Sequence, residues 1–323
     1  MRDRITFRQF RRLSRYPTLW GGSDSHDSVL PLDLRHGRCY DLRTFQFRLQ
    51  RNEQTVKDHS RFPSVLTIAG HDCSNGAGIT KDLEIFNDLG LFGLSAPTAF
   101  VIQGPQGVKS VHAVDVRILS DILEELEKDF SLEGVKIGAV PDQEHFRAII
   151  SFLTRNPDVF VVLDPVLSAK NHVPLVTDKG LDTLKNELLP LVDCLTPNLD
   201  EASLLLGKRV SDESSMEQAA REITEMGPDA VVLKGGHLEG DPCDVLVEGD
   251  QATFYRRKRV EKIVHGTGCI FSSALLSFRV RGSMLRDAFL SAEQLVGTLI
   301  EKSFRLGEDG YYYTSVKFAG ETV

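Results

Sequence analysis

The segment from His265 to Cys269 has the residue types of an anion-binding turn. It reads His-Gly-Thr-Gly-Cys and is followed by an apolar run that is typical of a helix start. Gly266 and Gly268 let the backbone turn tightly and approach a ligand closely. The free N–H groups of a helix N-terminus then face an anion, and the helix dipole adds to the attraction. Together with Thr267, this segment is predicted to stabilise negative charge on a transferred phosphoryl group.

Cys269 is the reactive side chain of this segment. At a helix N-terminus its pKa is expected to be lowered, because the helix dipole stabilises the thiolate. Such a thiolate could take the proton from an attacking hydroxyl group or orient that group. The alternative is a glycine turn before a buried helix, with an inert cysteine. The pentapeptide alone leaves both interpretations open, because short motifs also match by chance.

A second candidate is Asp82, on a helix predicted over residues 76–89. Ile79, Leu83 and Phe86 form the apolar stripe of that helix, and Asp82 lies at the edge of the stripe. The carboxylate needs a partner, because burying an unpaired charge costs free energy. The partner is either another protein group or an N–H group of a ligand.

Two further segments allow a structural and a functional interpretation. Asn198 and Glu201 have the spacing of a helix N-cap and its N3 partner, which requires no ligand. Lys234 directly follows an apolar run and precedes two glycines. It is either a solvated surface lysine or, at the carboxyl end of a strand, a contact for ATP phosphate.

The composition is ordinary for a globular protein with a sizeable core. Of the 323 residues, 41% are hydrophobic and 26% are charged. The net charge of −8 argues against a general nucleic-acid binder. The five cysteines are scattered without a CxxC pair, which argues against a disulfide scaffold and fits a reducing cytosol. No stretch approaches about 18 apolar residues, so no transmembrane helix is expected.

Residues 1–62 differ from the rest of the chain. They are rich in arginine, lack the apolar segment of a secretory signal and contain no catalytic motif. We expect an N-terminal extension that is disordered or absent from the mature fold; an organelle transit peptide is the alternative. The predicted domain covers residues 63–310, and residues 311–323 form a C-terminal tail.

The elements that must position the candidate residues alternate between strands and helices. This alternation predicts an α/β fold with a mostly parallel sheet and crossover helices. Ligands bind at the carboxyl ends of parallel strands, which is where the distinctive residues fall. Strands are predicted at 65–68, 135–137, 159–163, 194–196 and 230–233, helices at 76–89, 145–154 and 214–226, a hairpin at 243–247 and 252–256, and two helices after residue 269.

The segment from His265 to Cys269 resembles the anion-hole motif of the ribokinase superfamily. Many sugar kinases of that superfamily carry Asp where this chain has Cys269. The cysteine is similar to the vitamin-kinase branch, especially the hydroxymethylpyrimidine/phosphomethylpyrimidine kinases of thiamin biosynthesis. The resemblance spans about residues 63–300 and implies a three-layer α/β/α ribokinase-like fold. Other segments that agree in order and spacing are LTIAGHD at 66–72, GAGI at 76–79, TAFVIQ at 98–103, LDPV at 163–166, LTPNL at 195–199 and KGGH at 234–237.

This resemblance implies the reaction and the substrate pocket. The reaction would be ATP-dependent phosphorylation of 4-amino-5-hydroxymethyl-2-methylpyrimidine, followed by phosphorylation of its monophosphate. Family members use the residues matching Asp82 and Gln103 to hold the aminopyrimidine, and Gly70 and Val166 would line the same pocket. Cys269 would act on the substrate hydroxyl, with the amides of 266–269 as the anion hole.

The resemblance also implies cofactor and nucleotide contacts. Glu201 would organise Mg²⁺, often through water, and Asp164 is a second candidate for the same role. Lys234 and Thr267 would contact the nucleotide. The expected partners are small-molecule substrates and, from the family, a second copy of the chain in a homodimer. The expected location is the cytoplasm.

Some positions depart from the family pattern. Ala139 stands where Met is frequent, residues 171–173 replace a glycine-bearing loop, and three tyrosines at 311–313 replace a Gly/His-rich segment. Ala139 would leave a roomier pocket wall. A pyridoxal kinase is the near alternative, because that family shares the fold and some of its members share the cysteine. A non-catalytic pyrimidine-binding sensor is an alternative of another class. A transferase with Cys269 as nucleophile is a third; no histidine is placed in sequence to mark a Cys-His dyad, although the sequence leaves His265 open as a partner.

Overall fold

The computed structural model describes residues 63–104, 107–169, 173–236, 238–306 and 310–316. They form a nine-stranded sheet with the order β3-β2-β1-β4-β5-β6-β7-β8-β9. The central strands from β2 to β7 run parallel, whereas β3, β8 and β9 pair antiparallel with their neighbours. The strands are β1 (Ser64–Asp72), β2 (Phe92–Gly104), β3 (Gly107–Ala113), β4 (Leu132–Ile137), β5 (Phe160–Leu163), β6 (Cys194–Leu195), β7 (Ala230–Leu233), β8 (Cys243–Glu248) and β9 (Gln251–Arg256).

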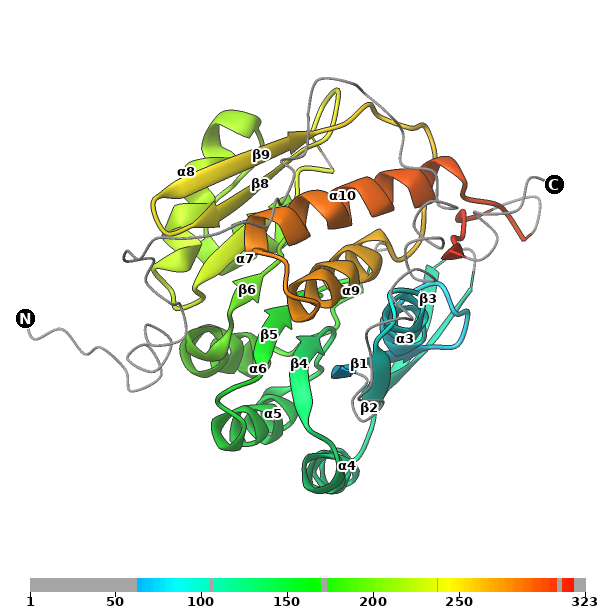
Figure 1. Cartoon of the computed structure of the whole chain (residues 1–323), viewed down its shortest axis with the longest axis vertical. Coiled ribbons are helices and arrows are strands. Elements are labelled where there is room, and N and C mark those ends of the chain that lie inside the picture. Colours follow the sequence, from blue (N-terminus) through cyan, green and yellow to red (C-terminus); the bar gives the residue numbers. More distant parts are fainter. Residues whose placement is uncertain (1–62, 105–106, 170–172, 237, 307–309, 317–323) are drawn as a thin grey trace, which may run out of the picture. The chain divides into compact units, whose positions relative to one another are not determined.

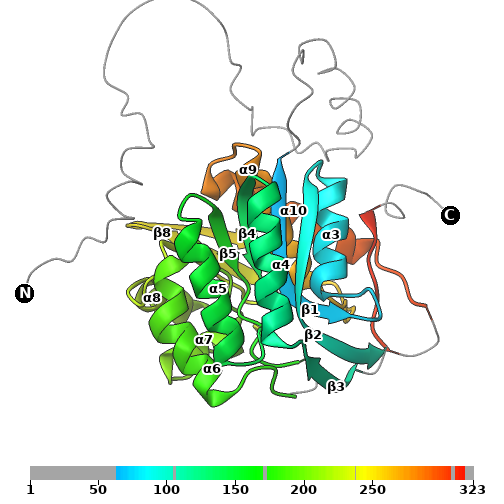
Figure 2. The same cartoon turned by 90° about the horizontal axis from the view of Figure 1, so that it is seen from below.

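Helices cover both faces of the sheet (Figure 1). Helices α3, α9 and α10 pack on one face, and α4 to α8 pack on the other, where α4 and α5 lie side by side (Figure 2). The predicted three-layer α/β/α fold with a mostly parallel sheet is confirmed. Within the described residues, none of the helices is long and apolar enough to cross a membrane. The helices are α3 (Gly78–Asp88), α4 (Val116–Asp129), α5 (Gln143–Arg155), α6 (Asp178–Thr183), α7 (Leu199–Leu206), α8 (Glu213–Thr224), α9 (Thr267–Val280) and α10 (Leu285–Glu301).

Two hydrophobic cores result from the alternation of side chains along the strands. In β5, Val161 and Leu163 join the core beneath α4 to α8, whereas Val162 joins the core beneath α9 and α10. Phe152 of α5 is fully buried in the first core and Phe289 of α10 in the second. Because helices cover both faces, the central strands have the nearly continuous apolar runs seen in the sequence.

The apolar runs located the central strands, but not the sheet edge formed by β2 and β3. The predicted runs coincide with β1 and β4 to β7, and the predicted hairpin is β8–β9. β2 was not predicted because exposed and half-buried side chains interrupt its apolar pattern. A strand at this edge, with β3 partly exposed beside it, has no continuous apolar signature.

Residues 311–316, predicted as the start of a tail, lie against the domain. Tyr312 forms a bridge with Val264, and Tyr313 forms one with Phe304. Tyr313 is buried. The predicted extension at 1–62 and residues 317–323 lie outside the described residues.

Candidate active site

The turn before α9 is held in place by contact between backbones. Gly266 has a φ of +73°, in the left-handed region that glycine adopts without strain. A Cβ atom at Gly266 would lie 1.9 Å from the carbonyl oxygen of Gly76. Likewise, a Cβ atom at Gly78, whose φ is +63°, would lie 2.2 Å from the carbonyl oxygen of Gly70. The start of α9 is therefore packed directly on the loop between β1 and α3.

The first turn of α9, predicted as an anion site, begins without a side-chain cap from the described residues. Its N-cap is Gly266. Its N–H groups, beginning at Thr267, are thus without a side-chain acceptor. A Cβ atom at Gly268 would lie 3.3 Å from both Lys234 Nζ and Asp164 Oδ2. The turn therefore lies directly beside these two charged groups.

Cys269 is buried, and the prediction that its pKa is lowered is wrong. Its side chain is only 8% exposed. Burial raises the pKa of the thiol to about 11, and the charges of Asp82 and Asp164 act in the same direction. The ammonium group of Lys136 and a hydrogen bond from the Gly78 N–H oppose this shift without cancelling it. Desolvation outweighs the helix N-terminus, so Cys269 is a neutral thiol at ordinary pH.

The Asp82 carboxylate is bonded by three protein groups. Thr67 Oγ1 and Lys136 Nζ donate to Oδ2 at 2.6 and 2.8 Å. Ser273 Oγ donates to Oδ1 at 2.8 Å. Asp82 and Lys136 are both 0% exposed, so their ion pair is wholly buried. Of the two alternatives left open by the sequence, the structure supplies the protein partner, and the carboxylate is not exposed to a ligand.

Asp164 and Lys234 form a second buried ion pair beside the α9 turn. Lys234 Nζ donates to Asp164 Oδ1 at 2.7 Å, and Thr196 Oγ1 donates to the same oxygen at 3.2 Å. Burial lowers the pKa of Lys234, but attraction to Asp164 and Glu201 outweighs burial and raises it. With 15% of its side chain exposed, Lys234 is not the solvated surface lysine of the structural alternative.

Asn198 and Glu201 form the predicted capping box at the start of α7. Glu201 N donates to Asn198 Oδ1 at 2.9 Å, and Asn198 N donates to Glu201 Oε2 at 2.8 Å. Burial raises the pKa of Glu201; Lys234 lowers it, and the nearby Asp164 raises it further. The capping role is thus confirmed, and it leaves a buried carboxyl group close to the Asp164–Lys234 pair.

The residues predicted to bind the acceptor substrate lie near the ends of β1, β2 and β4 and in the turn after β5. A Cβ atom at Gly70 would lie 3.2 Å from Val101 Cγ2 and 3.9 Å from Ala139 Cβ, so small residues face each other here. Thr98 Oγ1 donates to the carbonyl oxygen of Ala139 at 2.7 Å and fixes that wall. Val166 is half-buried in the turn after β5, where its N–H donates to Asp164 O.

Gln103, at the end of β2, contacts the anion turn through His265. Gln103 Nε2 lies 3.1 Å from His265 Nε2, and His265 Nε2 lies 3.0 Å from Asp72 Oδ2. The imidazole stacks on Tyr311 with 5.3 Å between ring centroids. His265, considered above as a partner for Cys269, is therefore engaged with Asp72 and Gln103.

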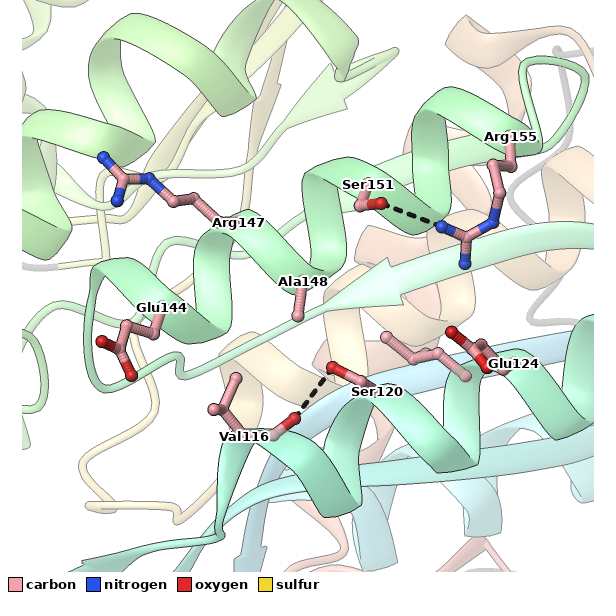
Figure 3. A pocket seen from close by; sticks show the side chains of 9 residues that line it. Val116, Ser120, Glu124, Glu144, Arg147, Ala148, Ser151 and Arg155 are labelled. Carbon is pink, nitrogen blue, oxygen red and sulfur yellow. Dashed lines mark hydrogen bonds between the residues drawn. The ribbon is translucent and has the colours of Figure 1, made fainter.

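A depression elsewhere on the molecule has no part in this site. It lies between α4 and α5 and has a volume of about 410 Å³ (Figure 3). Its polar groups include Ser120, Arg147 and Arg155, and Arg155 is paired with Glu127 outside the depression. Because α4 and α5 cover the face opposite α9, the depression is separate from the carboxyl edge of the strands.

Comparison with known proteins decides which family this arrangement represents. Residues 72–314 match the phosphomethylpyrimidine kinase family. The chain belongs to this family. Its fold is ribokinase-like and it is a phosphotransferase, so the predicted fold and enzyme class are confirmed.

Individual proteins that are similar to this chain support the same family. The hydroxymethylpyrimidine/phosphomethylpyrimidine kinase of Haemophilus influenzae is 34% identical over 255 residues, which are 77% of this chain and 95% of that protein. The thiamine biosynthesis bifunctional protein of Geobacter sulfurreducens is 39% identical over 248 residues, 76% of this chain but 50% of that protein. The chain thus spans about half of the bifunctional relative. An ADP complex of Bacillus subtilis pyridoxal kinase has a TM-score of 0.73 at 28% identity and covers 79% of this chain and 97% of that one.

Two charged residues of the site were missed by the sequence interpretation. Lys136 carried a signal, because it stands inside the apolar run of a buried strand, where an ammonium group needs a buried partner. Asp72 lay within a motif shared with the family, but its spacing gave no sign of contact with His265. That contact depends on how the α9 turn packs on the loop after β1.

Cys269 should be alkylated by iodoacetamide far more slowly than the exposed Cys73 at pH 7 to 8, because its raised pKa keeps it protonated. Its rate should rise about tenfold per pH unit toward pH 11, since the thiolate fraction grows in that proportion below the pKa. Peptide mass spectrometry resolves the two cysteines. Preferential labelling of Cys269 at pH 7 would contradict the assignment of a neutral thiol.

Lys136→Met should lower the free energy of unfolding by about 3–5 kcal/mol, because it leaves the Asp82 charge buried without its cation. Urea denaturation measures the change. The double variant Lys136→Met with Asp82→Asn should lose less unfolding free energy than the sum of the two single losses, since it leaves no unpaired charge. Strict additivity in this cycle would show that the two groups are not energetically coupled.

Proposed function

We propose that this protein transfers a phosphoryl group from ATP to 4-amino-5-hydroxymethyl-2-methylpyrimidine and then to its monophosphate, in thiamin biosynthesis. One observation carries the proposal. The uncapped first turn of α9 lies between the Asp164–Lys234 pair, which it meets at Gly268, and the loop after β1, which it meets at Gly266. A phosphate held there would have a cation on one side and the acceptor pocket on the other. The names of the relatives support the same substrates.

The nucleotide side is proposed to consist of Lys234 and Thr267. Lys234 remains a cation because of its carboxylate neighbours, and it follows β7 at the carboxyl edge of the sheet. Thr267 is the first residue of α9, where N–H groups favour phosphate oxygens. The ADP complex of the similar pyridoxal kinase supports the use of ATP.

Glu201 and Asp164 are proposed to hold Mg²⁺. Their environment fits a cation, because two buried carboxyl groups repel each other there and share one lysine, Lys234. Within the described residues there is no cluster of three His, Cys, Asp or Glu side chains, so water and phosphate would complete the shell, as is common for Mg²⁺. When bound, the ion would neutralise charge on the phosphates. Glu201 would do so while remaining in the capping box.

The acceptor pocket is proposed to be lined by Gly70, Val166 and Gln103. The small residues around Gly70 leave room for a flat ring, and Gln103 offers an amide at the pocket edge. Asp82 would support this pocket from beneath, through Thr67 and Lys136, rather than by an exposed carboxylate.

Cys269 is proposed to orient the attacking hydroxyl group. As a neutral thiol with a pKa of about 11 in the free protein, it is a hydrogen-bond partner first and would become a base only if a bound phosphate and cation changed its surroundings. The amides of residues 266–269 would stabilise the charge of the transferred group.

A pyridoxal kinase is the second candidate. It is favoured by the likeness to the B. subtilis enzyme and by Ala139, which leaves space at the pocket wall opposite Gly70. A homodimer and a cytoplasmic location remain proposals drawn from the family. Exposed Phe100 and Ile102 on β2 provide apolar surface for a dimer contact, and light scattering tests it.

A substrate panel tests the proposed function. Purified protein with ATP and Mg²⁺ is given the pyrimidine alcohol, its monophosphate or pyridoxal, and each product is identified by its mass. We expect both pyrimidines to be phosphorylated with a higher kcat/KM than pyridoxal. A preference for pyridoxal would establish the second candidate. Consumption of ATP without phosphorylation of any of the three compounds would favour a different acceptor. Binding of the pyrimidine without any turnover would indicate the sensor.

Cys269→Ala should lower kcat by about 10²-fold or more with little change in KM, because the side chain acts on the reacting hydroxyl group rather than on ground-state binding. Steady-state kinetics with both pyrimidines measures the effect. Cys73→Ala, at an exposed cysteine on the loop after β1, is the matched control and should leave kcat nearly unchanged. An unaltered kcat in Cys269→Ala would remove the cysteine from the mechanism.

A further inference from the structure

The turn after β7 is joined to the start of β8 by a carboxylate. The N–H group of Gly235 donates to Asp244 Oδ1 at 2.6 Å, and this hydrogen bond is buried. A Cβ atom at Gly235 would lie 2.1 Å from the carbonyl oxygen of Cys243, so the two main chains are in direct contact. The peptide group that follows Lys234 is therefore held from β8.

Asp244 lies on the face of the sheet that carries α9. Along β8, Val245 joins the core beneath α4 to α8, and Leu246 joins the core beneath α9 and α10. Because side chains alternate along a strand, Asp244 shares the face of Leu246. Leu233 pairs with Val245, so Asp244 lies beside the end of β7 from which Lys234 follows. The carboxylate is thus at the edge of the sheet where Lys234 meets the first turn of α9.

Glu293 of α10 is a second buried acid near Asp244. Its side chain is 1% exposed, and its Oε1 has no hydrogen-bond partner within the part of the chain that the structure describes. Burial raises the pKa of Glu293 well above its ordinary value, and the negative charge of Asp244 acts in the same direction. Glu293 is therefore neutral at ordinary pH and does not repel the Asp244 carboxylate.

The far end of the same loop is held by a cation. Arg259 donates to the carbonyl oxygens of Gly236, Leu238 and Gly240. Apart from its chain neighbours, no atom of the described residues lies within 4 Å of the Cβ position of Gly236, so a ligand can approach the backbone there. With Arg259 at the far end, Asp244 is the side chain that fixes the near end.

The position of Lys234 depends on this near end. Its N–H group donates to the carbonyl oxygen of Pro197 at 2.8 Å, and its Nζ donates to Asp164. The next peptide group is the one that Asp244 holds. Without Asp244, the N–H group of Gly235 would be a buried donor without an acceptor, and the turn would have to move to satisfy it. Such a movement changes where Lys234 presents its charge.

We propose that Asp244 is a positioning residue for the nucleotide: by holding the Gly235 peptide group, it keeps Lys234 and the open side of Gly236 aligned with the first turn of α9. This inference rests on the proposed function, because it concerns the nucleotide side of that site. Asp244 is only 7% exposed and is engaged with the turn, so it would act without touching ATP. Its loss should weaken nucleotide binding and leave the affinity for the acceptor molecule unchanged.

Removal of the acceptor oxygen tests this role. Asp244→Ala and Asp244→Val both leave the Gly235 N–H group without an acceptor, and valine keeps most of the side-chain volume in case the alanine variant does not fold. Each should raise the Kd for ADP and the KM for ATP by about tenfold or more, with the KM for the pyrimidine alcohol changed by less than about twofold. Calorimetry measures ADP binding without acceptor, and steady-state kinetics gives both KM values.

Two matched variants separate positioning from general damage. Asp244→Asn keeps an oxygen that can accept from the Gly235 N–H group, so its affinity for ADP should stay within about threefold of the wild type. Glu248→Ala removes a carboxylate at the other, exposed end of β8 and should leave both KM values unchanged. Thermal melting checks the fold of each variant.

The outcomes are distinct. Wild-type affinity for ADP in well-folded Asp244→Ala or Asp244→Val would overturn the inference, and so would an equal rise in KM for both substrates. Loss of ADP binding in well-folded Asp244→Asn would also overturn it, because the acceptor oxygen is still present there. Wild-type protein that binds no ADP would overturn the nucleotide side of the proposed function, and the inference with it. Wild-type protein that binds ADP but phosphorylates neither pyrimidine would overturn the proposed acceptor and leave the role of Asp244 standing.

Discussion

The buried carboxylate of Asp82 is the interaction on which the arrangement of the site depends. It is carried by α3 and receives hydrogen bonds from β1 through Thr67, from β4 through Lys136 and from α9 through Ser273. A fully buried ion pair needs further hydrogen bonds to offset its desolvation, and here Thr67 and Ser273 supply two of them to the carboxylate. Ser273 lies one turn after Cys269, so the same carboxylate also determines where the start of α9 sits. The first turn of α9 with Cys269 and the strands β1 and β4 are therefore all held by this one carboxylate.

Charge at the site is balanced in pairs. Asp82 is neutralised by Lys136 and Asp164 by Lys234, at the two sides of the α9 turn. Glu201 and Asp72 have no lysine of their own in this pairing; burial raises the pKa of Glu201, whereas hydrogen bonds lower that of Asp72. The buried thiol of Cys269 adds no charge in the free protein. The groups that would face an incoming anion are thus the amides of the α9 turn and the already paired Lys234, rather than an excess of positive charge.

The sequence predicted the central strands, the capping box of Asn198 and Glu201, and the family, because these depend on local patterns and on motifs. It did not predict the burial of Cys269, since the helix-terminus argument considers the dipole but not the desolvation that outweighs it. It also left the partner of Asp82 open, because Lys136 and Ser273 are distant in sequence and meet Asp82 only after the sheet and α9 are assembled. Strand β2, beside the edge strand β3, lacked a clear pattern for the same reason: its environment is set by its neighbours, not by its own composition.

The glycine contacts around the α9 turn separate what can change in this protein from what cannot. Gly266 rests on the carbonyl of Gly76, and Gly78 rests on that of Gly70, and the nearest atoms to the Cβ position of Gly266 and of Gly78 all belong to the main chain. The distance between the proposed phosphate site and the proposed acceptor site is therefore set by main-chain geometry. Residues such as Ala139, on the pocket wall, can vary in size without altering that distance. A lineage with this scaffold can acquire a new acceptor molecule by exchanging wall residues while its transfer chemistry is inherited intact.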